Sequence, residues 1–278
     1  MVSQVSVSKE TIAIEIDLLL QSIKWKYGYD YTNYSLNSIE RKIKHRLKLS
    51  ALTTISQLQS KVLHDPAFFE AIVQDFSINV TEMFRDPGFY QVFRQQVVQL
   101  LKSNSFIRIW VAGCSTGEEV YSMAIILKEA GIYDKTQLYA TDINESVINI
   151  ARKGIYTTDK IKKYTDNYQQ SGGQTSFSDY YTADNKFVVL DASLRKNIIF
   201  STHNLVSDTS FNEMQLISCR NVMIYFNQQL TNDVLLLLTE SLSKQGLLCL
   251  GDKESLRFSC VEKNYEIIDK KEKIYRRI

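Results

Sequence analysis

Hydrophobic positions follow two different periods along the 278-residue chain. Between residues 9 and 75 they recur at helical spacing, for example at Ile12, Ile16, Leu19 and Leu20, which indicates amphipathic helices. From about residue 106, short apolar runs alternate with amphipathic stretches, a pattern typical of a parallel sheet covered by helices. We therefore expect a small all-α domain followed by an α/β domain.

The α/β part predicts six strands and three helices. The strands are expected at 107–112, 137–141, 198–202, 214–219, 246–251 and 273–277, and the helices at 118–129, 145–152 and 228–242. After Gly154, a segment rich in Tyr, Ser and Gly leads into the short runs KFVVL and NIIF, which are too short and too β-branched for helices. An inserted antiparallel β-subdomain at about 163–200 is the prediction there. The turn at Asp86-Pro87-Gly88 lies in the expected linker, 78–100.

Composition narrows the class of protein. The chain has 33 Lys and Arg against 31 Asp and Glu, a formal net charge of +2, which argues against a bulk nucleic-acid binder. Its four cysteines are widely spaced and form no zinc motif, so we expect reduced thiols and no metal. It shows neither a signal-peptide pattern at its start nor an apolar run of about 18 residues. A soluble cytoplasmic protein is the expectation.

A candidate cofactor site follows the strand at 107–112. That strand runs into Gly113-Cys-Ser-Thr-Gly117-Glu-Glu and then into an amphipathic helix. Glycines at such a turn let a ligand approach the backbone, and open α/β sheets bind ligands beyond the carboxyl ends of their strands. The two acids, Glu118 and Glu119, also suit a helix start through the helix dipole. They do not suit a phosphate, whereas the cationic groups of S-adenosylmethionine would favour them.

A second acid supports a nucleoside ligand. Asp142 ends the next predicted strand, about 25 residues after the glycine turn, where a carboxylate can accept both ribose hydroxyls. The alternative is a helix N-cap. Together, the two features predict a cofactor that contains a nucleoside and is not a dinucleotide.

Four blocks of sequence resemble the CheR family, the methyltransferases that esterify glutamates of bacterial chemoreceptors. They are NVTEMFRDP (79–87), RIWVAGCSTGEEVYSMAI (108–125), YATDINESVINIARKGIY (139–156) and LISCRNVMIYF (216–226). The resemblance implies an N-terminal helical domain at 1–78 for substrate recognition. It also implies a Rossmann-like S-adenosylmethionine-dependent methyltransferase domain at 79–278 that carries the β-subdomain.

The resemblance further implies the site residues. Cofactor contacts would come from Asn79, Thr81, Arg85, Gly113, Glu119, Asp142, Asn204, Leu205, Arg220 and Asn221. Arg85 would orient the substrate carboxylate, and Tyr225 would pack or hydrogen-bond near the transferred methyl group. Structural alternatives exist: Asn79 and Thr81 could cap a helix, Arg220 could form an ordinary salt bridge, and Tyr225 could be part of the core.

A basic cluster marks the predicted substrate surface. Arg41, Lys42, Lys44, Arg46 and Lys48 lie within SIERKIKHRLKL. On a helix, Arg41, Lys44 and Lys48 share the face opposite the apolar stripe, and Lys42 with Arg46 flanks that stripe. The plain alternative is a solvated face. The resemblance implies that this helix faces acidic receptor helices, that the β-subdomain can tether a receptor's C-terminal peptide, and that the protein is a monomer.

Three other functions stay open at this point. Gln215 and Asp252-Lys253 depart from the family pattern, which leaves room for a methyltransferase of another protein or of a small molecule. A non-enzymatic module that binds S-adenosylmethionine or S-adenosylhomocysteine is the second. A nucleic-acid methyltransferase is the third, and it is motivated only by the basic cluster.

Overall fold

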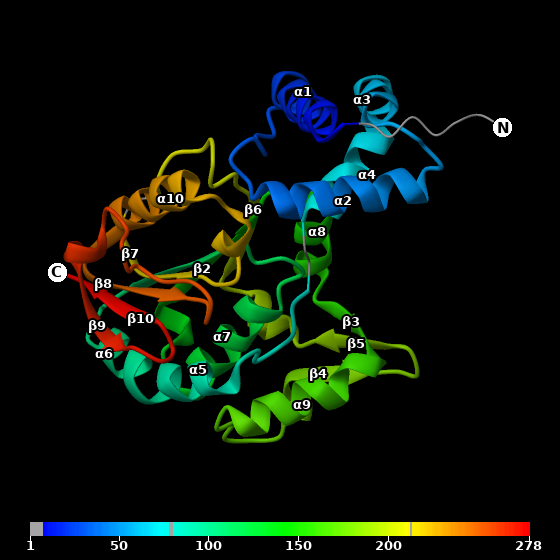
Figure 1. The fold of residues 1–278 in the computed structure, drawn as a ribbon. Coiled ribbons are helices and arrows are strands. Elements are labelled where there is room, and N and C mark those ends of the chain that lie inside the picture. Colours follow the sequence, from blue (N-terminus) through cyan, green and yellow to red (C-terminus); the bar gives the residue numbers. More distant parts are fainter. Residues whose placement is uncertain (1–7, 78–79, 212) are drawn as a thin grey trace. The chain divides into compact units, whose positions relative to one another are not determined.

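The computed structural model describes residues 8–77, 80–211 and 213–278, and the chain divides into two compact units (Figure 1). The smaller unit comprises Met1–Ile78 together with Tyr225–Thr231, and the larger comprises Asn79–Ile224 and Asn232–Ile278. Each unit has its own hydrophobic core.

The smaller unit is all-α, as predicted. Its helices are α1 (Lys9–Tyr27), α2 (Leu36–Leu49), α3 (Ile55–His64) and α4 (Pro66–Phe76). Local sequence fixes where they begin: Thr54 and Gln57 form a capping box at α3, and Asp65 caps α4, whose first residue is a proline. Their apolar faces meet in one core that includes Leu19, Ile39 and Ile72.

The larger unit is built on a seven-stranded sheet with the order β6-β2-β1-β7-β8-β10-β9. Its strands are β1 (Ile107–Ala112), β2 (Thr136–Asp142), β6 (Ile198–Thr202), β7 (Met214–Cys219), β8 (Leu242–Leu250), β9 (Tyr265–Asp269) and β10 (Ile274–Arg277). The first five in spatial order are parallel, and β10 and β9 are antiparallel additions. The chain runs outward in opposite directions from β1 and β7, so their carboxyl ends form the switch point where such sheets bind ligands.

Helices cover both faces of this sheet. Figure 1 shows α10 (Gln228–Ser241) on one side, and α5 (Pro87–Val92), α6 (Val98–Lys102) and α7 (Glu118–Glu129) on the other. A π-helical turn, η1 (Phe93–Val97), joins α5 to α6, and α8 (Glu145–Lys153) follows β2. The 3-10 turns are η2 (Tyr133–Lys135), η3 (Thr158–Lys160), η4 (Phe177–Tyr180), η5 (Ala192–Arg195), η6 (Met223–Tyr225) and η7 (Glu262–Asn264).

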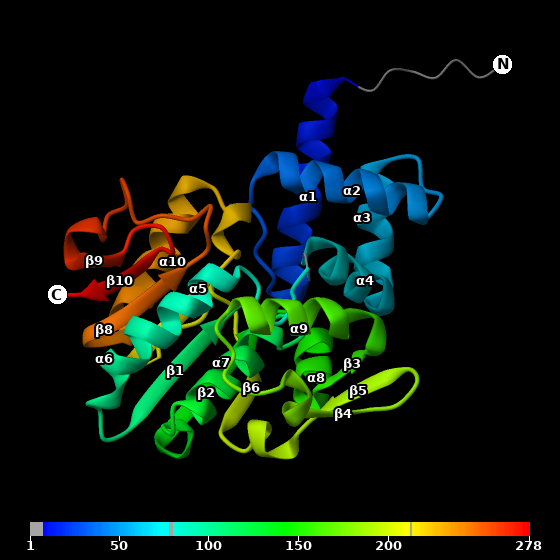
Figure 2. The same ribbon diagram turned by 90° about the horizontal axis from the view of Figure 1, so that it is seen from below.

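A three-stranded antiparallel sheet is inserted after α8, which confirms the predicted fold class. It has the order β3-β5-β4, formed by β3 (Ile155–Thr157), β4 (Tyr181–Ala183) and β5 (Phe187–Leu190), and is visible in Figure 2. Three details differ from the expectation at 163–200. The inserted sheet begins with β3 at Ile155, before the expected start. Ile198–Thr202 pairs with β2 in the large sheet, and a helix, α9 (Ile161–Gln170), lies inside the insertion.

Strand β8 begins at Leu242, four residues before the expected start, because its pairing with β7 continues past an irregularity beside Gln245, whose φ is +62°. Strand β9 was not predicted; its side chains Glu266 and Ile267 are both exposed, so it lacks a clear alternation of apolar and polar positions.

Candidate active site

The turn between β1 and α7 is shaped by glycines. Gly113 and Gly117 have φ of +72° and +95°, values that L side chains rarely adopt. A Cβ on Gly113 would lie 2.4 Å from Cγ2 of Val222, and one on Gly117 would lie 2.9 Å from Cβ of Ala151. Both glycines are therefore required for the close approach of α8 and of the loop after β7.

Glu119 is the centre of a charged network at the switch point. Its Oε1 accepts a hydrogen bond from the Ser218 hydroxyl at 2.6 Å, and its Oε2 accepts one from Nη1 of Arg220 at 3.0 Å. Nη2 of Arg220 donates to Oδ2 of Asp86 at 2.9 Å. The network thus joins the start of α7, the end of β7 and the turn before α5.

Arg220 is buried, and its guanidinium lies over the ring of Phe89, 3.9 Å from the ring centroid. Burial lowers the pKa of Arg220, but the negative charges of Glu119 and Asp86 outweigh it and hold the pKa above its ordinary value. Arg220 is therefore a permanent cation, and its buried Nε–H has no hydrogen-bond partner among the described residues.

Asp142 stands at the end of β2 and braces the glycine turn. Its carboxylate accepts from the backbone N–H of Ser115 at 2.9 Å and of Asn144 at 3.0 Å. Burial raises the pKa of Asp142, although these N–H groups oppose the shift. The side chains of these two donor residues, at the Ser115 hydroxyl and the Asn144 amide nitrogen, are buried without partners among the described residues.

Glu118 has a different role from its neighbour. It is fully buried and accepts from the Thr116 hydroxyl at 2.6 Å and from the Tyr164 hydroxyl at 3.0 Å. Burial raises the pKa of this carboxyl. The Tyr156 hydroxyl donates to the carbonyl of Thr116 at 2.8 Å. Glu118 is therefore a structural residue that ties the insertion to the glycine turn.

Arg85 lies in a constrained turn. Its neighbours Phe84 and Asp86 have φ of +53° and +59°, and Asp86 is held by Arg220. The N–H of Phe84 donates to the Ser122 hydroxyl at 2.9 Å, and Nη1 of Arg85 donates to the carbonyl of Val80 at 3.0 Å. The backbone on both sides of Arg85 is thus fixed while its side chain is only half-buried.

The sequence comparisons agree with this geometry. Residues 79–274 match the family model described as "CheR methyltransferase, SAM binding domain", and residues 14–77 match "CheR methyltransferase, all-alpha domain". The chain belongs to the CheR methyltransferase family. It is a methyltransferase that depends on S-adenosylmethionine, and the resemblance inferred from the four sequence blocks is confirmed.

Three relatives illustrate the similarity. The chain is 46% identical over 270 residues to "Putative methyltransferase Cher3" of Pseudomonas putida, covering 97% of this chain and 99% of that protein. It is 30% identical to a "Chemotaxis protein methyltransferase" of Borreliella burgdorferi, with 91% of each chain covered. It is 31% identical to "Chemotaxis protein methyltransferase 1" of Vibrio cholerae, over 72% of this chain and 75% of that one.

The residues at the switch point fit S-adenosylmethionine. This cofactor carries a sulfonium, an ammonium, a carboxylate and two ribose hydroxyls, but no phosphate. The chain offers the carboxylates of Glu119 and Asp142, the unpartnered buried Nε of Arg220, and the glycine turn between β1 and α7. Among the described residues no group of His, Cys, Asp or Glu could hold a metal ion, and no helix is long and apolar enough to cross a membrane.

The other residues predicted to contact the cofactor include three in the loops after β6 and β7. Asn204 and Leu205 follow β6, and the Asn204 side chain accepts from the N–H of Val206 at 3.0 Å. Asn221 follows Arg220 with φ of +62°. Thr81 is half-buried, and Asn79 lies outside the described residues.

Tyr225 belongs to the smaller unit. Its carbonyl accepts from the N–H of Ser35 at 2.8 Å, and Nζ of Lys42 lies 5.0 Å from the centroid of its ring. The described structure therefore places Tyr225 against α2 and leaves its catalytic role a prediction.

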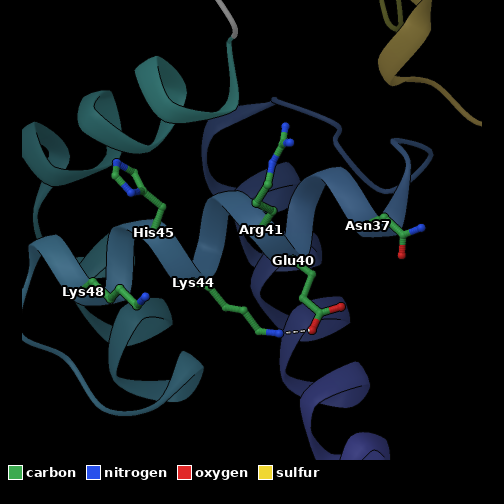
Figure 3. A pocket seen from close by; sticks show the side chains of 6 residues that line it. All are labelled: Asn37, Glu40, Arg41, Lys44, His45 and Lys48. Atoms are coloured by element: carbon green, nitrogen blue, oxygen red, sulfur yellow. Dashed lines mark hydrogen bonds and ion pairs between the residues drawn. The ribbon is translucent and has the colours of Figure 1, made fainter.

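The predicted basic face of α2 is smaller than expected. Lys42 is only 6% exposed and its ammonium donates to the carbonyl of Phe76, so its assignment to an exposed binding face is wrong. Arg46 is half-buried and paired with Asp75. Arg41, Lys44 and Lys48 are exposed and, with His45, line a hollow of about 480 Å³ (Figure 3).

Sequence reasoning missed several residues of this site. Asp86, Ser218 and Glu254 carry hydrogen bonds that hold the network and its loops. Asp86 and Ser218 lie within the blocks that resemble the family, but an acid before a proline and a serine in a strand have common structural explanations. Gln215, a departure from the family pattern, accepts the N–H of Arg108 at 2.8 Å and so helps to join β7 to β1.

Proposed function

We propose that this protein transfers the methyl group of S-adenosylmethionine to glutamate side chains of chemoreceptors, forming glutamate methyl esters. The observation that carries the proposal is the carboxylate-lined glycine turn, where Glu119 and Asp142 flank the switch point of the S-adenosylmethionine-binding domain. Proteins similar to this chain are named chemotaxis protein methyltransferases.

The contacts of the network support the following roles for the cofactor residues. When bound, S-adenosylmethionine supplies an activated methyl group. Asp142 would accept the ribose hydroxyls, Glu119 would face the cationic part of the cofactor, and the free Nε of Arg220 would donate to its carboxylate. The family resemblance adds Asn79, Thr81, Gly113, Asn204, Leu205 and Asn221.

The substrate needs no general base. A glutamate side chain has an ordinary pKa of about 4.3, so it is already an ionised nucleophile at neutral pH. The protein's task is to align the carboxylate and to remove it from water. Arg85 suits this task because the backbone on both sides of it is fixed by Ser122 and Arg220 while its guanidinium has donors to spare. Tyr225 would pack near the transferred methyl group.

The exposed cations of α2 suit an acidic receptor helix. Arg41, Lys44 and Lys48 follow one side of the helix, and of these Lys44 is paired with Glu40 at 2.5 Å. Exposed charges of this kind raise the rate of encounter and the orientation of a complex more than its final affinity. Lys42 and Arg46 instead join α2 to α4. Lys42 donates to the carbonyl of Phe76, and Arg46 is paired with Asp75.

The inserted sheet suits an extended peptide. Ile155 pairs with Val189 across β3 and β5, and Phe187 lies two residues before Val189 on the same face. These three side chains are 40%, 37% and 47% exposed. A receptor's C-terminal peptide could add to an edge strand and cover this apolar face.

One experiment tests the proposal. The protein is incubated with methyl-labelled S-adenosylmethionine and receptor-containing membranes of its source organism. We expect label on a receptor that is released by mild base, as methyl esters are. Base-stable label, or label on a different protein or a small molecule, would contradict the glutamate assignment.

A further inference from the structure

Glu254 is a buried carboxylate that follows the end of β8. It is 5% exposed, and its two oxygens accept four backbone N–H groups. Oε1 accepts from Val222 at 2.9 Å and Met223 at 2.7 Å, and Oε2 accepts from Asn221 at 2.9 Å and Gly251 at 2.6 Å. Three of these donors are consecutive residues in the loop after β7.

The backbone around Glu254 is shaped to receive the carboxylate. Asn221 has φ of +62°, which turns its N–H toward the same point as the two that follow. The N–H of Glu254 donates to the carbonyl of Gly251 at 3.0 Å and closes a tight turn. A Cβ on Gly251 would lie 2.8 Å from both the Asn221 nitrogen and Oε2 of Glu254. Gly251 and Glu254 thus form one device that joins the ends of β8 and β7.

This device does not constrain the two residues between Gly251 and Glu254. Asp252 and Lys253 are both exposed at the tip of the turn. Their identity is not constrained by the loop that Glu254 holds, so the departure from the family pattern there leaves the device intact.

The loop that Glu254 holds packs against the glycine turn. Val222 stands over Gly113 so closely that a Cβ on the glycine would meet Val222 Cγ2 at 2.4 Å. Any movement of residues 221–223 therefore moves the wall of the β1–α7 turn. It also moves Asn221, which directly follows Arg220.

All four partners of Glu254 are donors, so only the ionised carboxylate complements them. Burial raises the pKa of Glu254, and the four N–H groups act in the opposite direction. An amide at this position would place its NH₂ group against two N–H groups in either orientation.

We propose that Glu254 is a positioning residue for the cofactor pocket: by holding Asn221–Met223 it fixes Val222 against Gly113. The inference rests on the proposed function only in taking this turn as the place where S-adenosylmethionine binds. Glu254 itself acts through the loop.

The test is the variant Glu254→Gln, with Asp252→Asn as the matched control two residues away. Calorimetry measures the Kd for S-adenosylhomocysteine, and steady-state kinetics measure KM for S-adenosylmethionine and kcat. We expect Glu254→Gln to raise the Kd and this KM by at least about tenfold with a much smaller change in kcat, and Asp252→Asn to match the wild type. Glu254→Asp, which keeps the charge, should give an intermediate Kd.

A folded Glu254→Gln protein with the wild-type Kd would overturn the proposal, as would equal losses in kcat and in affinity. If Glu254→Gln does not fold, Val222→Ala removes the contact with Gly113 and leaves Glu254 in place. A raised Kd in that variant supports the proposal, and an unchanged Kd overturns it. Because the Kd is measured without a receptor, a failure of receptor methylation would not be mistaken for a failure of this inference.

Discussion

Arg220 reaches from the end of β7 to the first turn of α7, where its Nη1 donates to Oε2 of Glu119 at 3.0 Å. The pair connects the two sides of the switch point. Because Arg220 keeps its charge, the buried guanidinium depends on its carboxylate partners to offset the cost of burial, so the pair has consequences both for stability and for binding.

Replacement of Arg220 by Leu should lower the free energy of unfolding by about 3 kcal/mol, because Glu119 would lose its main counter-charge. Urea denaturation measures the change, and Arg257→Leu, at an exposed arginine, is the control. A loss below about 1 kcal/mol would show that Glu119 readily finds another partner or a proton.

Replacement of Arg85 by Ala should lower kcat by roughly 10²-fold, because a preorganised donor to the reacting carboxylate is lost. Binding of S-adenosylhomocysteine should remain measurable by calorimetry, since Glu119, Asp142 and Arg220 are untouched. Arg85→Lys should recover part of the activity. Full turnover by Arg85→Ala would remove this residue from the mechanism.

Charge reversal of Arg41, Lys44 and Lys48 to Glu should lower kcat/KM for receptor at low salt and weaken its dependence on ionic strength. Reversal of Lys244, Lys263 and Lys270, which are equally exposed but lie in the larger unit, serves as the control. Equal effects of the two triple variants would mean that net charge matters and the α2 face does not.

Lys42 should titrate well below an ordinary lysine. Burial, and then the charge of Arg41, lower its pKa to about 8, while Asp75 opposes the shift. Between pH 8 and about 10.5 the unfolded chain binds more protons at this site than the folded chain, so the stability of the smaller unit should rise with pH across that window. Below pH 8 the folded chain carries the full free-energy cost of burying the charged Lys42.

NMR of the Lys42 side chain gives its pKa directly, and denaturation between pH 7 and 10 gives the slope. Lys42→Met should abolish this part of the slope. A Lys42 titration near 10.5 would contradict the prediction.

Six of the seven strands of the large sheet could be predicted because they are short, apolar and bounded by glycine or polar residues. Residues 107–112 and 118–129 coincide with β1 and α7 at both ends. The insertion was harder. Helix α9 buries Tyr164, Asn167 and Tyr168 at helical spacing, but the Tyr-rich polar segment that it opens was assigned to an antiparallel β-subdomain.

Candidate site residues could be inferred from the sequence where local turn geometry or charge indicated them. They could not be inferred where their role depends on contacts with residues distant in the chain. Gly113, Glu119 and Asp142 follow from turn geometry and charge, whereas the burial of Lys42 depends on the carbonyl of Phe76, 34 residues away. Glu254 is bonded to residues more than 30 positions earlier. The one local signal for it was Gly251, the last residue of a predicted strand, three residues before an acid.

The two tyrosine hydroxyls of the insertion, from Tyr156 and Tyr164, end on the carbonyl of Thr116 and the carboxylate of Glu118. In evolutionary terms, the insertion is not an independent accessory that could be exchanged freely between homologues. A transplanted insertion must bring both hydroxyls with it or leave Glu118 buried with fewer donors. The exposed face of the small sheet lies outside this constraint, whereas Tyr156 and Tyr164 are tied to the glycine turn between β1 and α7.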